Sequence, residues 1–231
     1  RVPVPRVRVH PVRVPVAPVR AVVPVRPSSS DPAVPAVREV PVGEVWTGGS
    51  PAVSATDVWI QEYLRRWRIP HRVVAAGDPP LYWGHAVVQV VHPAAENGST
   101  PPMRAERGLG ANDRSLVLRV QNGDQALLLT ADLERRGEEA LLGSGATLAA
   151  QVLKVPHHGS RYSSTQAFID AVGPRVALFS VGHRNPFRHP HPEVVARYQA
   201  AGVRILRTDR HGAISVEMRP GETRVRSRRE E

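Results

Sequence analysis

The sequence contains no cysteine, and Lys154 is its only lysine. The absence of cysteine excludes disulfide frameworks, thiolate metal sites and cysteine nucleophiles. No apolar run reaches the ~18–20 residues that a helix needs to cross a bilayer, so no transmembrane segment is expected. What the chain has in excess is arginine: its 231 residues carry a net charge of +10. This balance favours a polyanionic partner, and the plain alternative is a solvated basic surface.

The composition divides the chain into three parts. Residues 1–38 are rich in Val, Pro and Arg. Proline fixes φ and has no N–H to donate, so we expect this low-complexity segment to be disordered, without helix or strand. Residues 39–218 show the alternation of apolar runs and turn residues that is typical of one folded α/β domain. Residues 219–231 form a charged tail that we expect to be frayed.

Within residues 39–218, periodicity and turn signals predict the elements. A β-hairpin is expected around Asn122-Gly123, because Asn-Gly between apolar runs is a strong hairpin signal. Strands are also expected over 42–46, 72–76, 86–91, 149–155, 175–181, 203–207 and 213–218, and helices over 54–69, 134–142, 164–172 (capped by Ser163 or Ser164) and 192–201. Hairpins followed by alternating βα units indicate a layered sandwich with helices outside the sheets.

Two groups of candidate residues follow apolar strands, where sites of α/β proteins are usually found. Asp132 follows the strand that ends near Thr130, and a helix N-cap is its alternative role. His157 and His158 follow the next strand, ahead of Gly159 and Ser160. Neighbouring side chains on an extended backbone point to opposite faces, so only one of the two His can face a given metal unless the glycine bends the chain.

A third group lies in the turn-rich segment from Ser180 to Pro192, which contains Asn185, His189 and His191. Its cations and the amide suit phosphate contacts, and a solvent loop is the alternative. Taken together, a carboxylate at one strand end and a His pair at the next describe half of a dinuclear metal site. We therefore expect Asp132, His157 or His158, and His189 to lie within about 10 Å of each other.

These residues stand in a series of motifs that resembles a known family. The series runs through Asn112-Asp-x-Ser115, Leu129-Thr-Ala-Asp-Leu-Glu134, Val155-Pro-His-His-Gly-Ser160 and Ser163-Ser164. It continues with Ser180-Val-Gly182, Asn185-x-x-x-His-Pro-His191 and Thr208-Asp-x-x-Gly212. In this order the motifs are similar to the metallo-β-lactamase-like domain at the C-terminus of ComEC-type competence proteins, over roughly residues 36–218.

The resemblance implies a metallo-β-lactamase-like αββα sandwich and a metal-dependent nuclease that degrades the non-transported DNA strand during natural transformation. It implies manganese or zinc as cofactor, DNA as partner, and a soluble domain attached to the membrane channel of a parent protein on the outer side of the bacterial plasma membrane. Asp132 and His158 would then be metal ligands, and His157, His189 and His191 would be catalytic. The substrate-binding residues implied are Asn112, Ser160, Arg161, Ser163, Ser164 and Asn185.

The sequence departs from this family in its first part. The family has a Thr-His-x-x-x-Asp-His-x-Gly-Gly segment that supplies most metal ligands. In this chain Asp31 is the only acid in the corresponding stretch 26–37, and His10 is the only His before residue 71. Ala131 also stands where glycine usually precedes the bridging Asp. We therefore expect the N-terminal part of the fold to be truncated or replaced, and nuclease activity to be impaired.

Three other interpretations stay open. The chain is a catalytically inactive nucleic-acid-binding module if Arg161, Arg184 and Arg188 cluster beside His189. It is a serine hydrolase if Ser160 acts with His157 and Asp132, although no Gly-x-Ser-x-Gly elbow surrounds Ser160. It is a degenerate, non-functional fragment if the missing half of the sandwich prevents the rest from folding well.

Overall fold

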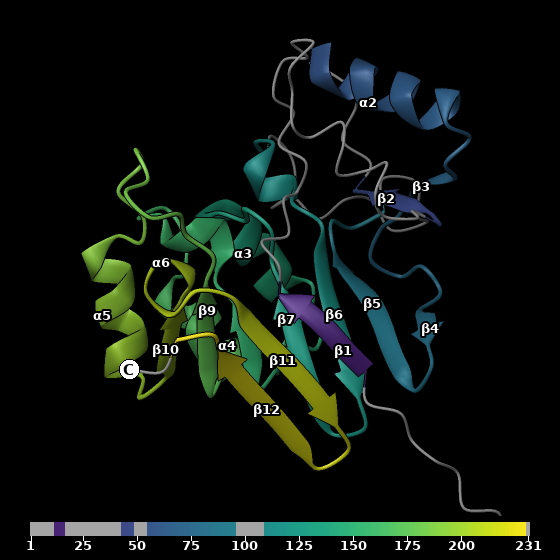
Figure 1. Cartoon of the computed structure of the whole chain (residues 1–231). Helices are drawn as coiled ribbons and strands as arrows, with labels where there is room; N and C mark the ends of the chain where they lie inside the picture. The colour runs from purple at the N-terminus through teal and green to yellow at the C-terminus, as the bar shows by residue number, and fades with distance from the viewer. Residues whose placement is uncertain (1–11, 17–42, 49–54, 96–108, 230–231) are drawn as a thin grey trace, which may run out of the picture.

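The computed structural model describes residues 12–16, 43–48, 55–95 and 109–229 (Figure 1). A mixed seven-stranded sheet with the order β10-β9-β8-β7-β6-β5-β4 lies at the centre. Neighbouring strands are antiparallel from β4 to β7 and parallel from β7 to β10. The strands are β4 (Leu81–Trp83), β5 (Ala86–His92), β6 (Val117–Asn122), β7 (Gln125–Leu129), β8 (Val152–Lys154), β9 (Val176–Phe179) and β10 (Arg204–Arg207).

Other elements cover both faces of this sheet. A three-stranded sheet of β1 (Val12–Val16), β11 (Ile214–Arg219) and β12 (Glu222–Ser227) packs on one face. Helices α3 (Arg135–Gly143), α4 (Gln166–Val172) and α5 (Pro192–Ala200) pack on the other (Figure 1). The remaining elements are β2 (Val45–Thr47), α2 (Ala55–Arg66), β3 (His71–Val73), η2 (Asn112–Arg114), η3 (Pro156–Gly159) and α6 (Thr208–His211), with β2 and β3 forming a small parallel sheet.

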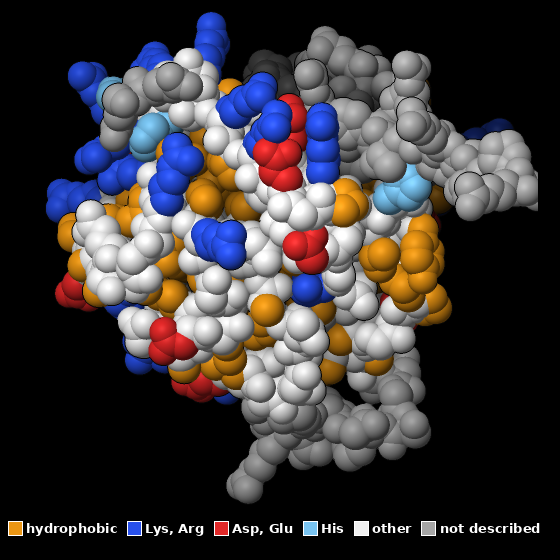
Figure 2. Space-filling model, turned by 90° about the horizontal axis from the view of Figure 1, so that it is seen from below, with side chains coloured by type: hydrophobic (Ala, Val, Ile, Leu, Met, Phe, Trp, Pro, Cys, Tyr) orange, Lys and Arg blue, Asp and Glu red, His pale blue; other side chains and the backbone are white. Residues whose placement is uncertain are grey.

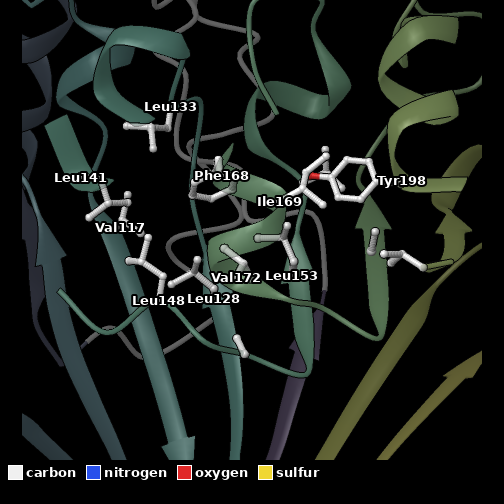
Figure 3. Close-up of a cluster of buried hydrophobic side chains, with 14 of the residues drawn as sticks. Val117, Leu128, Leu133, Leu141, Leu148, Leu153, Phe168, Ile169, Val172 and Tyr198 are labelled. Carbon is white, nitrogen blue, oxygen red and sulfur yellow. The ribbon is translucent and has the colours of Figure 1, made fainter. Parts of the chain in front are cut away.

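The strand pleat divides the core into two clusters. Leu127 and Leu128 are both fully buried, but as neighbours on β7 they point to opposite faces. Leu128 packs in the cluster under the helices, with Leu153 and Phe168 (Figure 3). Leu127 packs in the cluster against β11, with Val216. This mixed α/β architecture with a large central sheet confirms the predicted fold class and is consistent with a metallo-β-lactamase-like sandwich.

Polar bonds at one end of the sandwich hold the two sheets together. Asn122 donates from Nδ2 to the carbonyl of Met218 over 3.0 Å, and the amide of Gly221 donates to Oδ1 of Asp124 over 2.6 Å. Gly123 has a φ of 63°, and a Cβ there would stand 3.0 Å from Pro220. The β6–β7 turn therefore needs glycine both for its conformation and for its close contact with the second sheet.

Most predicted elements are present, with shifts at their ends. The predicted hairpin is confirmed, but Asn122 pairs with Gln125, so the turn is Gly123-Asp124 rather than Asn122-Gly123. Helix α4 is capped by Thr165, whose side chain accepts from the amide of Phe168, and not by Ser163 or Ser164. The short elements β4, η2 and α6 were not predicted, because each has at most four residues and so shows little periodicity.

Two expectations about the chain ends were wrong. Residues 12–16 form a strand paired with β11, although residues 1–38 were expected to contain none. A strand with Pro15 is possible there because β1 is an edge strand, where one side of the backbone has no ladder partner. Residues 222–227, expected to be a frayed tail, pair with β11 through the two-residue turn Pro220-Gly221. Residues 1–11 and 17–42 lie outside the described part of the chain.

The described surface carries exposed aromatic and basic side chains. Tyr82 and Trp83 on the edge strand β4 are 70% and 59% exposed. In the space-filling view, Lys and Arg side chains gather toward one side of the face that is shown (Figure 2).

Across residues 12–16, 43–48, 55–95 and 109–229, the helices all lack the length or apolarity needed to cross a bilayer.

Candidate functional site

The candidate residues meet at the carboxyl ends of three adjacent parallel strands. Asp132 follows β7, the His157-His158 pair follows β8, and His189 lies in the long connection after β9. Because β7, β8 and β9 are parallel neighbours, these three connections leave the sheet at the same edge. The distances given below place His158 against Asp132, and His157 beside both His158 and His189, which agrees with the predicted convergence of Asp132, His157 or His158, and His189. We refer to these four residues as the Asp-His cluster.

The turn after β8 lets both imidazoles of the pair face the cluster. His157 and His158 have φ values of 43° and 55°, in the left-handed region that side chains other than glycine rarely adopt. This backbone removes the alternation that extended geometry would impose, so the ring centroids lie 6.3 Å apart. Gly159 follows with φ 82°, and a Cβ there would meet Pro190 at 2.7 Å. The turn is strained and tightly enclosed, as is common at functional sites.

Asp132 and His158 form the centre of the cluster. Oδ1 of Asp132 lies 3.3 Å from Nε2 of His158. The other nitrogen, Nδ1, lies 2.6 Å from the carbonyl oxygen of Ser180 and donates to it. Burial and then the charge of Lys154 lower the pKa of His158, while Asp132 opposes them. The imidazole is therefore favoured in its neutral form, with the lone pair of Nε2 directed at the space beside the carboxylate.

Glu134 orients the second imidazole. Its Oε1 accepts from Nδ1 of His157 over 2.9 Å and from the side-chain amide of Asn112 over 3.1 Å. His157 in turn lies 5.6 Å from His189, measured between ring centroids. Burial and the neighbouring His157 and His158 lower the pKa of His189. Asn112 is therefore linked to the cluster indirectly: it bonds Glu134, and Glu134 bonds His157.

The loop of Asp132 is fixed by polar contacts from two sides. Its amide donates to Oγ of Ser115 over 3.2 Å, and Nζ of Lys154 donates to the carbonyl of Ala131 over 2.8 Å. Ala131 has a φ of 46°, which explains why glycine suits this position in the family that the sequence resembles. Burial lowers the pKa of Lys154 to about 8, while the Asp132 carboxylate favours its charged form.

The serines proposed to bind substrate are buried. Ser160, Ser163 and Ser164 are 3%, 1% and 0% exposed. Ser163 donates to the carbonyls of Pro156 and Ser160, and Ser164 accepts from the hydroxyl of Tyr198. In this structure they hold the loop before α4, and their assignment to substrate stays a prediction. The hydroxyl of Ser160 accepts from the amide of Tyr162, which gives no support to the serine-hydrolase alternative.

The connection after β9 is held by Asn185. Its amide donates to the carbonyls of Gly182 and His189, and its oxygen accepts from the amide of His189 over 2.9 Å. The side chain thus shapes the loop that presents His189. Of the arginines proposed to gather beside His189, Arg161 instead approaches His191, with 3.4 Å between NH2 and Nε2. Arg184 is exposed on the loop.

The sequence did not single out two acidic residues that have clear structural roles. Glu134 was visible only as the end of a motif, although it bonds both Asn112 and His157. Glu138 is fully buried and accepts from the amides of Ser164 and Thr165. Burial raises the pKa of Glu138 against these hydrogen bonds. The sequence could have indicated a structural role for Glu138, because this acid lies on the buried side of an expected helix, where an unpaired carboxylate would be costly.

The donors present do not by themselves fit a tightly bound metal ion. Asp132 and His158 converge, and the Ser180 carbonyl fixes the His158 tautomer as it does for metal-bound histidines. Glu134 likewise holds Nδ1 of His157, which leaves Nε2 of that ring as a further candidate donor. However, within the described ranges no three of the His, Asp and Glu side chains are placed so that they could hold one metal ion together. A catalytic zinc typically takes three protein ligands, so the described donor set is incomplete.

The sequence is similar to competence proteins of bacteria. No family model matches it. The chain is 39% identical to competence protein ComA of Neisseria gonorrhoeae over 150 residues, which are 64% of this chain and 22% of that protein. It is 41% identical to ComE operon protein 3 of Bacillus subtilis (strain 168) over 103 residues, which are 45% of this chain and 13% of that protein. The predicted resemblance is confirmed by these relatives.

The matched regions are small parts of the relatives. The chain spans about a fifth of the length of the first relative and less of the second.

Among solved structures, the chain is similar to that of Igni18, a novel metallo hydrolase from the hyperthermophilic archaeon Ignicoccus hospitalis KIN4/I. The TM-score is 0.40 at 15% identity, with 74% of this chain and 66% of the other covered.

Proposed function

We propose that this chain, which resembles the C-terminal metallo-β-lactamase-like domain of ComEC-type competence proteins, handles DNA during uptake by binding phosphodiesters at the Asp-His cluster. The observation that carries the proposal is the convergence of Asp132, His157, His158 and His189 from three separate connections. The similarity to competence protein ComA supports DNA as the ligand. We further propose that the domain is attached to a membrane channel on the outer side of the plasma membrane, as the family resemblance implies.

The cluster offers oriented groups to a phosphate. Glu134 occupies Nδ1 of His157 and so leaves Nε2 for a ligand, while the ring stands beside His189. When protonated, either imidazole donates to a phosphate oxygen. Arginines elsewhere on the surface add attraction that does not depend on base sequence and is weakened by salt.

We expect hydrolysis by this chain to be weak. Two ions about 3.5–4 Å apart require a bridging carboxylate and several further ligands. Asp132 can bridge, but among the described residues His158 is the one imidazole that lies directly against it, at 3.3 Å. Arginine cannot complete the set because it stays protonated and repels cations. Metal-dependent nuclease activity with manganese or zinc is the ancestral chemistry that the resemblance implies.

The test combines binding and cleavage of a labelled linear DNA duplex by the full chain. We expect binding that falls as salt rises, and little cleavage across a manganese titration. His157→Ala and His189→Ala should each weaken binding several-fold. His85→Ala is the matched control, since His85 is exposed and precedes β5 at the opposite end of the sheet.

Two results would contradict the proposal. Equal binding of DNA by the cluster variants and the His85 control would show that the cluster does not contact DNA. Efficient cleavage by the unmodified chain, lost in both Asp132→Ala and His158→Ala, would show that the metal site is complete. Joining a first half that carries the His-x-x-x-Asp-His motif should create activity, which Asp132→Ala then abolishes.

A further inference from the structure

A pocket of about 530 Å³ lies beside the Asp-His cluster. Nothing in the proposed chemistry uses this pocket, although its lining includes Glu134, which is bonded to His157 of the cluster. The charged residues that line it include Asp113, Glu134, Arg135, Arg161, Glu193 and Arg197. The arginines come from α3, from the loop after η3, and from α5, so three separate elements direct cations toward one space.

The acidic residues of the pocket are largely engaged with the protein itself. Oδ1 of Asp113 accepts from the amide of Gly137 over 2.8 Å. Glu134 accepts from Asn112 and His157. Glu193 is 75% exposed in its side chain, and its carboxylate is 3.9 Å from Nδ1 of His191. With Arg136 the lining holds four arginines against three acids, so the pocket carries one positive charge in excess.

The arginines are arranged as donors around this space. Arg197 is held in place by donating from NH1 to the carbonyls of Ser163 and Ser164. Arg161 is exposed, and its NH2 lies 3.4 Å from His191. Arg135 is exposed at the first position of α3, where its backbone amide is bonded to the carbonyl of Tyr162 over 2.9 Å. Planar guanidinium groups match the oxygens of a phosphate, which they bind with two parallel hydrogen bonds.

We infer that this pocket binds the phosphate monoester of a nucleotide, a ligand with more negative charge than an internal phosphodiester. The inference rests on the proposed function, because Glu134 joins the pocket to His157 and hence to the cluster. A strand held by its terminal phosphate would place the next phosphodiester against the imidazoles. The monoester belongs either to the end of a DNA strand or to a free mononucleotide.

The experiment measures binding of the full chain to one single-stranded oligonucleotide with three end chemistries: 5′-phosphate, 3′-phosphate and hydroxyl only. We expect one phosphorylated end to bind about tenfold more tightly than the hydroxyl ends, because hydrogen bonds between arginine and a phosphate monoester are assisted by both charges. Arg135→Gln and Arg161→Gln should each abolish most of this gain. Arg175→Gln removes the same charge from an exposed position before β9, at the other end of the sheet, and should retain the gain.

The remaining arms separate the sources of the ligand and the two hypotheses. Competition by a 5′-mononucleotide, reduced in Arg161→Gln, would identify a free nucleotide as a ligand of the pocket, and its absence alongside the end effect would identify the strand end. Equal binding of all three oligonucleotides, with no competition, would overturn the pocket assignment. In that case, salt-sensitive binding of the hydroxyl-ended strand that still depends on His157 would leave the proposed function intact.

Discussion

The carboxylate of Asp132 lies 3.3 Å from Nε2 of His158, whose opposite nitrogen is fixed by the carbonyl of Ser180. One residue follows β7, and the other lies in the turn after β8. The contact therefore depends on the parallel pairing of these two strands and on the left-handed backbone of His158. The contact thus links the end of a regular strand to a strained turn. Both are needed to bring the carboxylate and the imidazole of the cluster together.

The pKa of His158 tests this arrangement. We expect it below the usual value for histidine, because burial and the nearby Lys154 disfavour the charged ring. Lys154→Met should raise the pKa by removing a positive charge. Asp132→Asn should lower it further by removing the negative charge that opposes them. Nitrogen-detected NMR titration gives both the pKa and the tautomer, which we expect to carry hydrogen on Nδ1.

Glu139→Gln is the control for that titration, since it removes an exposed acid on α3 without touching the cluster. It should leave the pKa of His158 unchanged. A rise in this pKa on Asp132→Asn would show that the carboxylate does not act on the ring as the 3.3 Å contact requires.

Lys154 should make stability depend on pH. Burial lowers its pKa from 10.5 to about 8 in the folded chain. Between these two pH values the unfolded chain binds more protons, so the free energy of unfolding should rise with pH. The gain should reach about 3 kcal/mol at most, because a tenfold change in proton affinity corresponds to ~1.4 kcal/mol. Urea unfolding at several values from pH 7 to pH 10 measures it.

Lys154→Met provides the comparison for this pH dependence. Tyr198 has a pKa raised by burial, so its own contribution to stability falls at higher pH and opposes that of Lys154. The difference between the unmodified chain and Lys154→Met isolates the lysine. A difference that stays constant from pH 7 to pH 10 would show that Lys154 is not desolvated.

The sequence predicted the sheet better than the site. Apolar runs such as Leu127-Leu128-Leu129 indicated buried strands, and the order of those strands placed Asp132 and His158 at one edge. The bond between Glu134 and His157 could not be predicted, because it depends on a turn whose backbone angles are unusual for histidine. Strand β12 was missed because its charged composition concealed an alternation of exposed and half-buried residues that is visible only once it pairs with β11.

Ala131→Gly should stabilise the protein. Ala131 has a φ of 46°, where a Cβ costs about 1–2 kcal/mol, whereas glycine adopts this conformation freely. Part of the gain is offset because glycine has more freedom in the unfolded chain, so we expect about 0.5–1 kcal/mol. Ala196→Gly on the exposed side of α5 is the matched control and should destabilise by about 1 kcal/mol. Equal losses at both positions would contradict the left-handed assignment.

Glu138→Ala should be among the most destabilising single changes in the described part of the chain. The carboxylate of Glu138 is fully buried and accepts from the amides of Ser164 and Thr165, the latter over 2.8 Å. Removing it leaves the buried amide of Ser164 and the half-buried amide of Thr165 without an acceptor, which costs about 1–3 kcal/mol for each. We expect a loss of about 3 kcal/mol, seen in urea unfolding. Glu139→Ala, one position along α3 and exposed, should change stability by less than about 0.5 kcal/mol. Similar small effects from both substitutions would show that the loop before α4 does not depend on Glu138.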